Sequence, residues 1–124
     1  MKYTKIENNF EDDRGIIRDI LSHEPIDAVT IITSKEGAVR ANHYHKETYQ
    51  WTYVMKGKIN YVSQFKDEEV KTTVLNEGDL VVSEPFESHA LQAVVDSELM
   101  ILTRGPRGGK EYESDTFRLD KPLI

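Results

Sequence analysis

Apolar residues recur along the chain in short stretches, separated by residues that favour turns. These stretches are rich in β-branched and aromatic residues or alternate apolar with polar positions, as strands do. No stretch keeps the 3.6-residue apolar period of a helix over three turns. Strands that recur about every 8–12 residues predict an all-β sandwich or barrel, and we expect a double-sheet jelly roll. The predicted strands cover residues 1–6, 28–33, 39–45, 50–55, 59–65, 70–75, 80–82, 89–95 and 98–103.

Length, charge and cysteine content narrow the class of protein. The 124 residues suit a single domain spanning 1–124. The formal net charge is −6 and no basic stripe is present, so we expect no nucleic-acid partner. The chain has no cysteine, which excludes a disulfide framework and thiolate metal ligands and fits the cytoplasm. No apolar stretch is long enough for a signal peptide or a membrane span, so we expect a cytoplasmic protein with a small-molecule ligand.

Histidines are the candidate chemistry of the chain. His43 and His45 lie two apart in a predicted strand, so their side chains point to the same face, and His89 lies in a distant predicted hairpin. Neutral imidazoles are good ligands for divalent metal ions, and three of them leave positions open for water or substrate. The alternative to metal binding is that these histidines are polar residues without a ligand that line the mouth of a barrel. His23 has no partner in the sequence, and we interpret it as a surface or capping residue.

The segment 37–57 resembles the first motif of the cupin family. Gly37, His43, His45 and Gly57 all fall in the register of that motif, whose glutamate is replaced here by Gln50. The resemblance implies a double-stranded β-helix, which is the cupin jelly roll, with a divalent metal ion in the barrel. Zinc, manganese, iron and nickel are the candidate ions. Gln50 offers only a neutral carbonyl oxygen, so the metal would be held less tightly than with a glutamate.

The segment 78–93 is similar to the second cupin motif. Gly78 and His89 keep the spacing of that motif. Pro85 is displaced by one position, Phe86 stands in place of the inner glycine, and Ala93 replaces the closing asparagine. The two motifs together imply a metal site made of His43, His45, His89 and Gln50.

A narrower resemblance concerns substrate. Residues 12–15 and 39–44 look like two motifs of dTDP-4-dehydrorhamnose 3,5-epimerases, which are cupin enzymes acting on nucleotide-linked sugars. This resemblance implies that Arg14 and Arg40 contact a ligand and its phosphates, and that His43 is a general base next to a keto group. If the strand over 39–45 is regular, however, Arg40 and His43 point to opposite faces. Lys58 is a further basic residue that could contact an anionic ligand.

The two resemblances assign different roles to His43, because a metal ligand cannot also be a free base. The epimerases lack a second histidine, and the presence of His45 favours the metal-binding cupins. Tyr53 and Tyr61 are the candidate proton donors. An outward Trp51 would mark a subunit interface, where aromatic residues are enriched, and we expect a homodimer.

The sequence therefore predicts a metal-binding cupin that acts on carbohydrates or nucleotide-sugars as an isomerase or epimerase. An iron-dependent dioxygenase using the same ligands is one alternative. A non-catalytic module that binds a sugar or a small acid is another, since Gln50 replaces the carboxylate.

Overall fold

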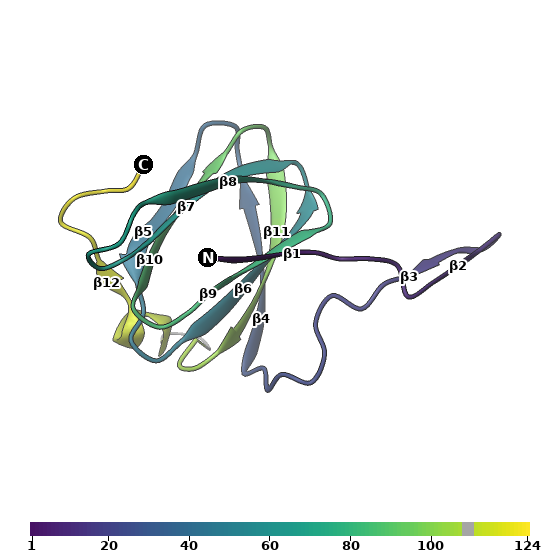
Figure 1. The fold of residues 1–124 in the computed structure, drawn as a ribbon, viewed down its shortest axis with the longest axis horizontal. Coiled ribbons are helices and arrows are strands. Elements are labelled where there is room, and N and C mark those ends of the chain that lie inside the picture. Colours follow the sequence, from purple (N-terminus) through teal and green to yellow (C-terminus); the bar gives the residue numbers. More distant parts are fainter. Residues whose placement is uncertain (108–110) are drawn as a thin grey trace.

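Two five-stranded antiparallel sheets face each other in the computed structural model, which describes residues 1–107 and 111–124 (Figure 1). The first sheet has the order β1 (Lys2–Lys5), β9 (Asp79–Ser83), β6 (Tyr49–Lys56), β11 (Ser97–Arg104) and β4 (Ala28–Ser34). The second has the order β12 (Phe117–Arg118), β5 (Val39–Tyr44), β10 (Glu87–Ala93), β7 (Lys58–Phe65) and β8 (Lys71–Asn76). Apart from the β7–β8 hairpin, neighbours in the two large sheets are distant in sequence, as in a jelly roll, so the prediction of an all-β jelly roll is confirmed.

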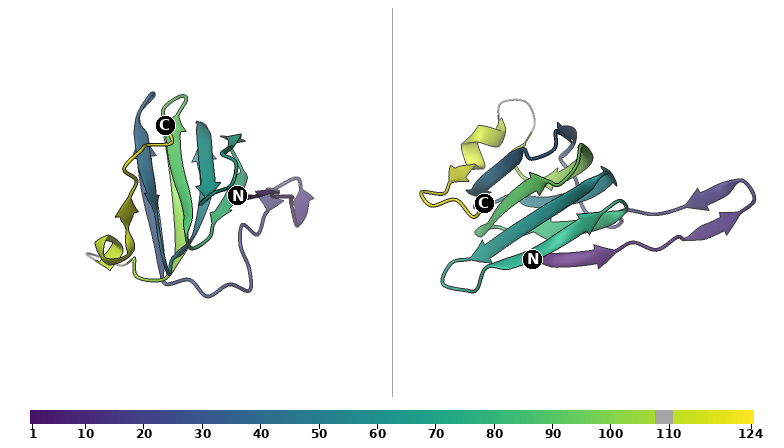
Figure 2. Two further views of the ribbon diagram at one scale, coloured as in Figure 1. Left: turned by 60° about the vertical axis from the view of Figure 1, so that its left-hand side comes forward. Right: turned by 90° about the horizontal axis from the view of Figure 1, so that it is seen from above.

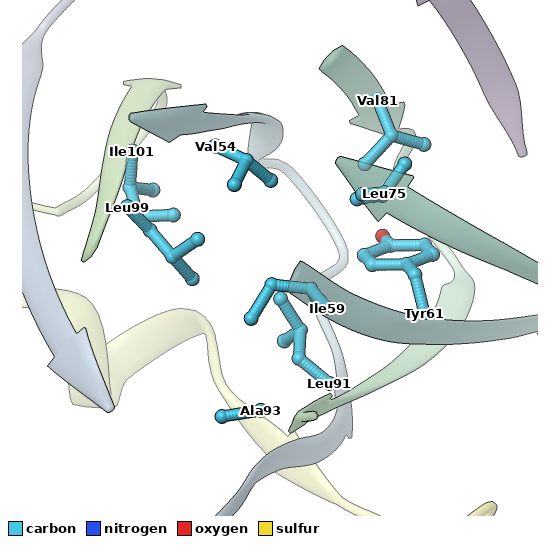
Figure 3. Packing of buried hydrophobic residues seen from close by; sticks show 9 residues of the cluster. All are labelled: Val54, Ile59, Tyr61, Leu75, Val81, Leu91, Ala93, Leu99 and Ile101. Atoms are coloured by element: carbon cyan, nitrogen blue, oxygen red, sulfur yellow. The ribbon is translucent and has the colours of Figure 1, made fainter. Parts of the chain in front are cut away.

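The core lies between the two sheets and follows from the alternation of side chains along the strands. In β11, Leu99 and Ile101 are buried while Met100 between them lies on the other face. Burying a large aliphatic side chain contributes roughly 1.5–3 kcal/mol, so this inner face stabilises the barrel. The buried cluster consists of Val54, Ile59, Tyr61, Leu75, Val81, Leu91, Ala93, Leu99 and Ile101 (Figure 3).

The strand that carries the first histidines is irregular. Ala41 and Asn42 have positive φ angles of 73° and 56°, and the pairing of β5 with β10 shifts between His89 and Ala90. The Asn42 side chain accepts a hydrogen bond from the backbone N–H of Leu123 at 2.8 Å, which ties the bulge to the C-terminal segment. A bulge of this kind breaks the two-residue alternation of a strand.

The C-terminal segment is built into the barrel. It forms a short 3-10 helix, η1 (Glu111–Asp115), and then β12, which pairs with β5. Among the described residues, no helix is long and apolar enough to cross a membrane.

A hairpin of β2 (Phe10–Asp12) and β3 (Gly15–Ile17) projects away from the barrel as an arm (Figures 1 and 2). The two strands form a sheet of their own, and residues 7–17 are all exposed. The Arg14 side chain lies at the turn of this hairpin and forms an ion pair with Asp12 at 2.6 Å.

Candidate functional site

Three histidine rings meet inside the barrel. His43 lies at the end of β5, His45 follows it, and His89 lies on the adjacent strand β10, directly opposite His43. The ring centroids are 4.7 Å apart for His43 and His89, 4.8 Å for His43 and His45, and 5.4 Å for His45 and His89. One ring nitrogen from each histidine lies within 4.8 Å of the others. The structure therefore brings together the three histidines that the sequence singled out.

The cluster forms one wall of a cavity between the sheets. His43 and His45 line this cavity together with Arg40 and Gln50. The remaining walls are largely apolar, and they include Ile32, Ile59, Leu91, Leu99 and Ile101. A ligand in this cavity would meet a few polar groups on an apolar background, which is typical of small-molecule sites.

Hydrogen bonds decide which nitrogen of His45 carries a proton. Its Nδ1 lies 2.7 Å from the backbone carbonyl oxygen of Asp115. A carbonyl can only accept, so Nδ1 is the protonated nitrogen of the neutral ring and Nε2 holds a free lone pair.

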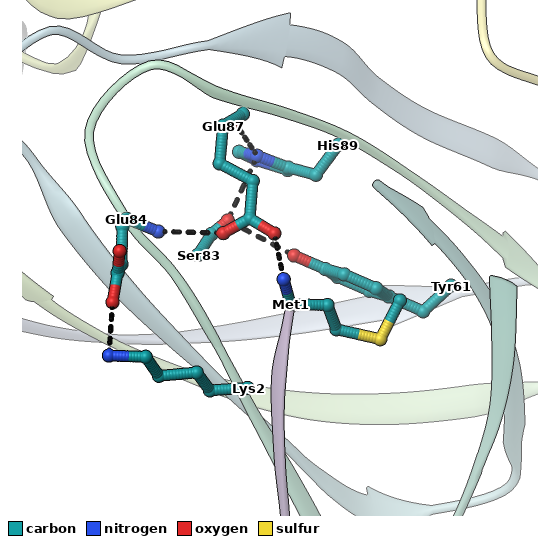
Figure 4. A network of polar contacts seen from close by, with 7 residues as sticks. All are labelled: Met1, Lys2, Tyr61, Ser83, Glu84, Glu87 and His89. Atoms are coloured by element: carbon teal, nitrogen blue, oxygen red, sulfur yellow. Dashed lines mark hydrogen bonds and ion pairs between the residues drawn. The ribbon is translucent and has the colours of Figure 1, made fainter. Parts of the chain in front are cut away.

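The same reasoning applies to His89. Its Nδ1 lies 3.0 Å from the Ser83 hydroxyl and 3.3 Å from the backbone carbonyl of Glu87 (Figure 4). The carbonyl again requires the proton on Nδ1. Among the described residues, the buried Nε2 atoms of His45 and His89 have no hydrogen-bond partner.

Burial favours the neutral form of His43 and His89. It lowers the pKa of His43 to about 4, with smaller contributions from the neighbouring His45 and from Arg118 and Arg107. Burial also lowers the pKa of His89 well below its ordinary value. Neutral imidazoles with free lone pairs are the form in which histidine binds a metal or takes up a proton.

The three residues fit a divalent metal ion by their chemistry. Three imidazoles converge, two of them present unpartnered buried lone pairs, and no described carboxylate competes for those nitrogens. An unpaired buried polar atom costs free energy, about 1–3 kcal/mol each, which a bound cation would remove. Gln50 lines the same cavity and donates a long hydrogen bond, 3.4 Å, to Thr52.

Arg40 lies in the cavity despite its odd spacing from His43. The expectation that the two side chains point to opposite faces is wrong, because the bulge at Ala41 and Asn42 restores Arg40 to the face of His43. The Arg40 guanidinium donates to the Ser34 hydroxyl at 2.7 Å and to the Thr33 carbonyl at 2.8 Å, which fixes its position at the wall.

Other predicted site residues lie elsewhere in this chain. Tyr53 is on the outer face of β6, because Val54 beside it enters the core, and it pairs with Met100 on that outer face. Lys58 is exposed at the turn between β6 and β7. Arg14 lies on the projecting arm. These three residues lie near the motifs in the sequence, but their side chains do not line the cavity.

Trp51 also faces outward, yet its own chain covers it. Its side chain is 6% exposed, with the Tyr49 ring stacked beside it and the Arg104 guanidinium above it. The hypothesis that an outward Trp51 forms a subunit contact therefore does not hold for the indole ring.

Several residues near the site carry no signal in the sequence. Asp115 lies seventy positions after His45, and Arg107 and Thr116 also line the cavity from the C-terminal segment. No local motif marks them, since only the docking of that segment onto β5 brings them close. Ser83 was more accessible to prediction, because alternation from buried Val81 places it on the inner face of β9.

Known structures share this fold over nearly the whole chain. QdtA, a sugar 3,4-ketoisomerase from Thermoanaerobacterium thermosaccharolyticum solved in complex with TDP, is 20% identical and has a TM-score of 0.79, with 96% of this chain and 88% of that chain covered. A 3,4-ketoisomerase from Helicobacter canadensis is 20% identical with a TM-score of 0.79, covering 95% and 90%. The dTDP-4-dehydrorhamnose 3,5-epimerase from Sulfolobus tokodaii is 20% identical with a TM-score of 0.74, covering 99% and 88%. No curated protein sequence matches the chain.

The barrel and these structural likenesses define the protein as a cupin-type jelly roll, which confirms the resemblance inferred from the two motifs. The chain belongs to the family described as "Polysaccharide biosynthesis C-terminal domain", which matches residues 10–117.

Proposed function

We propose that this protein is an isomerase or epimerase of nucleotide-linked keto sugars. The single observation that carries the proposal is the pair of buried, unpartnered Nε2 atoms of His45 and His89, of which His45 lines the cavity between the sheets. Isomerisation and epimerisation next to a ketone both need a proton to be removed from carbon and returned. A neutral imidazole nitrogen with its other nitrogen fixed by a carbonyl suits that step.

The cavity walls support this reaction in two ways. Arg40 is positioned to attract an anionic part of a ligand, for which a guanidinium is well suited. Apolar residues such as Ile32 and Leu99 exclude water from the reacting carbon. The T. thermosaccharolyticum ketoisomerase of the same fold has been solved with TDP-4-keto-6-deoxyglucose, a ligand of the proposed class.

The proposal includes a divalent metal ion, with zinc, manganese, iron and nickel as candidates. His43, His45 and His89 would hold it, and Gln50 would add a weak neutral ligand. When bound, such an ion supplies Lewis acidity to a carbonyl or hydroxyl oxygen of the substrate. The same lone pairs cannot bind an ion and accept a proton, so His45 and His89 would act as bases only in the metal-free protein. We also propose that the protein acts in the cytoplasm.

Deuterium incorporation tests the proposed reaction. The protein, stripped of metal or loaded with each candidate ion, is incubated with TDP-4-keto-6-deoxyglucose in D2O, and the sugar is examined by NMR and mass spectrometry. We expect deuterium on a carbon next to the ketone and the appearance of an isomer. Tight binding without exchange in every metal form would contradict an isomerase and support the binding module. Oxygen uptake by the iron form would support the dioxygenase.

We propose further that the protein is a homodimer held through its arm. Phe10, Ile16 and Ile17 on the arm are 51%, 50% and 59% exposed, although an isolated two-stranded hairpin is marginally stable in water. A second copy can cover this apolar surface, and the outer edge of its β4 presents exposed Val29 and Ile31. In such a dimer, Arg14 on the arm of one copy would contact a ligand bound in the cavity of the other copy.

Sedimentation velocity tests the role of the arm. We expect the parent chain to sediment as a dimer and the double variant Ile16→Asp/Ile17→Asp as a folded monomer, because burying two carboxylates in an interface is costly. Val74→Asp is the matched control, since Val74 is a similarly exposed apolar residue on β8. A dimer that survives in the double variant, or a monomeric parent, would contradict the proposal.

A further inference from the structure

We propose that two sets of positioning residues hold His45 and His89 in the tautomer that is protonated on Nδ1 and leaves the Nε2 lone pair free. Tyr61 and Ser83 act on His89, and Asp115 acts on His45. The inference rests on the proposed function, because it explains how the same cluster keeps its Nε2 lone pairs directed at its centre. It also changes the role of Tyr61, which the sequence suggested as a proton donor.

Ser83 lies between Tyr61 and His89. Its hydroxyl oxygen is 3.0 Å from the Tyr61 hydroxyl and 3.0 Å from Nδ1 of His89 (Figure 4). All three side chains are fully buried, at 0–1% exposure. The Tyr61 ring is nearly parallel to the His89 ring, at 4° and 6.3 Å between centroids. The pair therefore limits both the rotation of the imidazole and the partners available to its Nδ1.

The direction of these hydrogen bonds determines the tautomer of His89. The Glu87 carbonyl can only accept, so His89 carries its proton on Nδ1, and Ser83 accepts from the same N–H. A serine hydroxyl can also donate, and a hydroxyl turned toward Nδ1 would favour the tautomer protonated on Nε2. We infer that the Ser83 hydroxyl donates its single proton to the Tyr61 oxygen, 3.0 Å away, so that toward Nδ1 it can only accept, which disfavours that second arrangement. Without that hydrogen bond, Nε2 would lose the lone pair that binds a metal or accepts a proton.

Tyr61 has no access to substrate in this arrangement. Its hydroxyl is buried against Ser83 and the ring does not line the cavity. Burial also raises the pKa of the Tyr61 hydroxyl, which therefore stays protonated. Tyr61 acts through Ser83 on His89 rather than on a ligand.

Asp115 performs the corresponding task for His45 by means of two groups. Its carbonyl accepts from Nδ1 of His45 at 2.7 Å. Its carboxylate accepts from the backbone N–H groups of Lys46, Glu47 and Thr48 at 2.9, 3.0 and 2.9 Å, and from the Thr48 hydroxyl at 2.7 Å. The carboxylate thus fixes the turn after His45 to η1, and this keeps the Asp115 carbonyl beside the imidazole.

Hydrogen bonds stabilise the ionised carboxylate of Asp115. Burial acts to raise the pKa of Asp115, but the hydrogen bonds from Thr48, Lys46 and Glu47 outweigh burial and lower it. Outer partners that orient metal-binding histidines typically change metal affinity by about 10–100-fold when they are removed. We expect effects of that size at Ser83, Tyr61 and Asp115.

The first experiment measures the tautomers directly in the metal-free protein. Long-range 1H–15N NMR of histidine-labelled protein at pH 8 should show His45 and His89 protonated on Nδ1. Tyr61→Phe should raise the fraction of His89 protonated on Nε2, because the Ser83 proton is then free to turn toward Nδ1. Ser83→Ala leaves only the Glu87 carbonyl beside Nδ1 and should keep the proton there, and neither variant should change His45. Ser88→Ala is the matched control, since it removes a hydroxyl beside His89 from the opposite face of β10 and should change neither ring.

The second experiment measures zinc affinity by competition with a chelator. Tyr61→Phe, Ser83→Ala and Asp115→Asn should each weaken zinc binding about 10–100-fold. Ser83→Thr, which keeps the hydroxyl, should stay near the parent. Asp120→Asn, an exposed residue of the same segment, should have no effect.

The outcomes separate this inference from the proposed function. An unchanged His89 tautomer in Tyr61→Phe would overturn the role of that pair, and unchanged zinc affinity in Asp115→Asn would overturn the role of Asp115. A fixed Nδ1–H tautomer that shifts in Tyr61→Phe supports the inference even if the protein binds no zinc and exchanges no deuterium. The absence of both zinc binding and deuterium exchange would instead overturn the proposed function.

Discussion

His45→Ala should lose stoichiometric metal if the parent holds an ion. If the parent holds none and His45 is a free base, the variant should lower the rate of isomerisation by about 10²–10⁴-fold, the size of effect typical for the loss of a proton-transferring group. His45 is the cluster residue that is both buried and part of the cavity wall. Its removal leaves two imidazoles, His43 and His89, on one side of any ion. It also removes one of the two buried lone pairs on which the proposed function depends.

Metal content by inductively coupled plasma mass spectrometry, on protein purified without an affinity tag, provides the first measurement. Deuterium exchange into the keto sugar provides the second. His23→Asn is the control, because His23 is exposed with a positive φ of 62°, a conformation that asparagine tolerates. Full metal content and unchanged exchange in His45→Ala would contradict both the metal centre and the proton-transfer role. Loss of exchange from a parent that never held metal would leave His45 as a base acting alone.

Gly57→Ala should destabilise the fold by about 3–5 kcal/mol, even though Gly57 lies far from the histidines along β6. Gly57 has a φ of +99° in the turn between β6 and β7. An added Cβ would lie 2.7 Å from the backbone carbonyl oxygen of Asp96 and would also collide with the Ser97 side chain. Ser97 cannot simply move away, because its hydroxyl accepts from the Lys58 N–H at 3.1 Å and donates to the Val95 carbonyl at 2.8 Å.

Gly37→Ala is the matched control, since it is the other glycine of the same motif. Its φ is +83°, but no heavy atom lies within 4 Å of an added Cβ. We therefore expect only the cost of the left-handed backbone, about 1–2 kcal/mol. Urea unfolding of the two variants and the parent measures the difference, and equal losses would contradict the steric explanation. Metal content of the folded fraction should stay at the parent level in both, because neither glycine touches a histidine.

The spacing of the histidines was sufficient to predict the cluster, for a specific physical reason. The fold follows from alternating strands, and alternation places His43 and His45 on one face whatever their surroundings. Pairing of β5 with β10 then places His89 opposite His43. The first relation is local, whereas the second joins distant segments and was predicted from the resemblance of residues 37–57 and 78–93 to the two cupin motifs.

Predictions for the arginines and tyrosines depended on regular strands and on local neighbours. Arg40 was predicted on the wrong face because Ala41 and Asn42 form a bulge in β5 with positive φ angles, and the prediction assumed a regular alternation of side chains. Tyr53 does not line the cavity because alternation from the buried Val54 beside it directs it outward. Tyr61 is in the barrel, but its hydroxyl meets Ser83 rather than the cavity.

The sequence by itself therefore determined the all-β class and most of the strands through periodicity and turn chemistry, and it predicted the convergence of three histidines through its resemblance to the two cupin motifs. Only the tertiary structure decided the tautomers of His45 and His89, the face of Arg40 and the part played by Asp115. Those features depend on contacts between segments tens of residues apart, as between His45 and the carbonyl of Asp115. Hydrogen-bond direction is a property of such contacts, and no local pattern along the chain contains it.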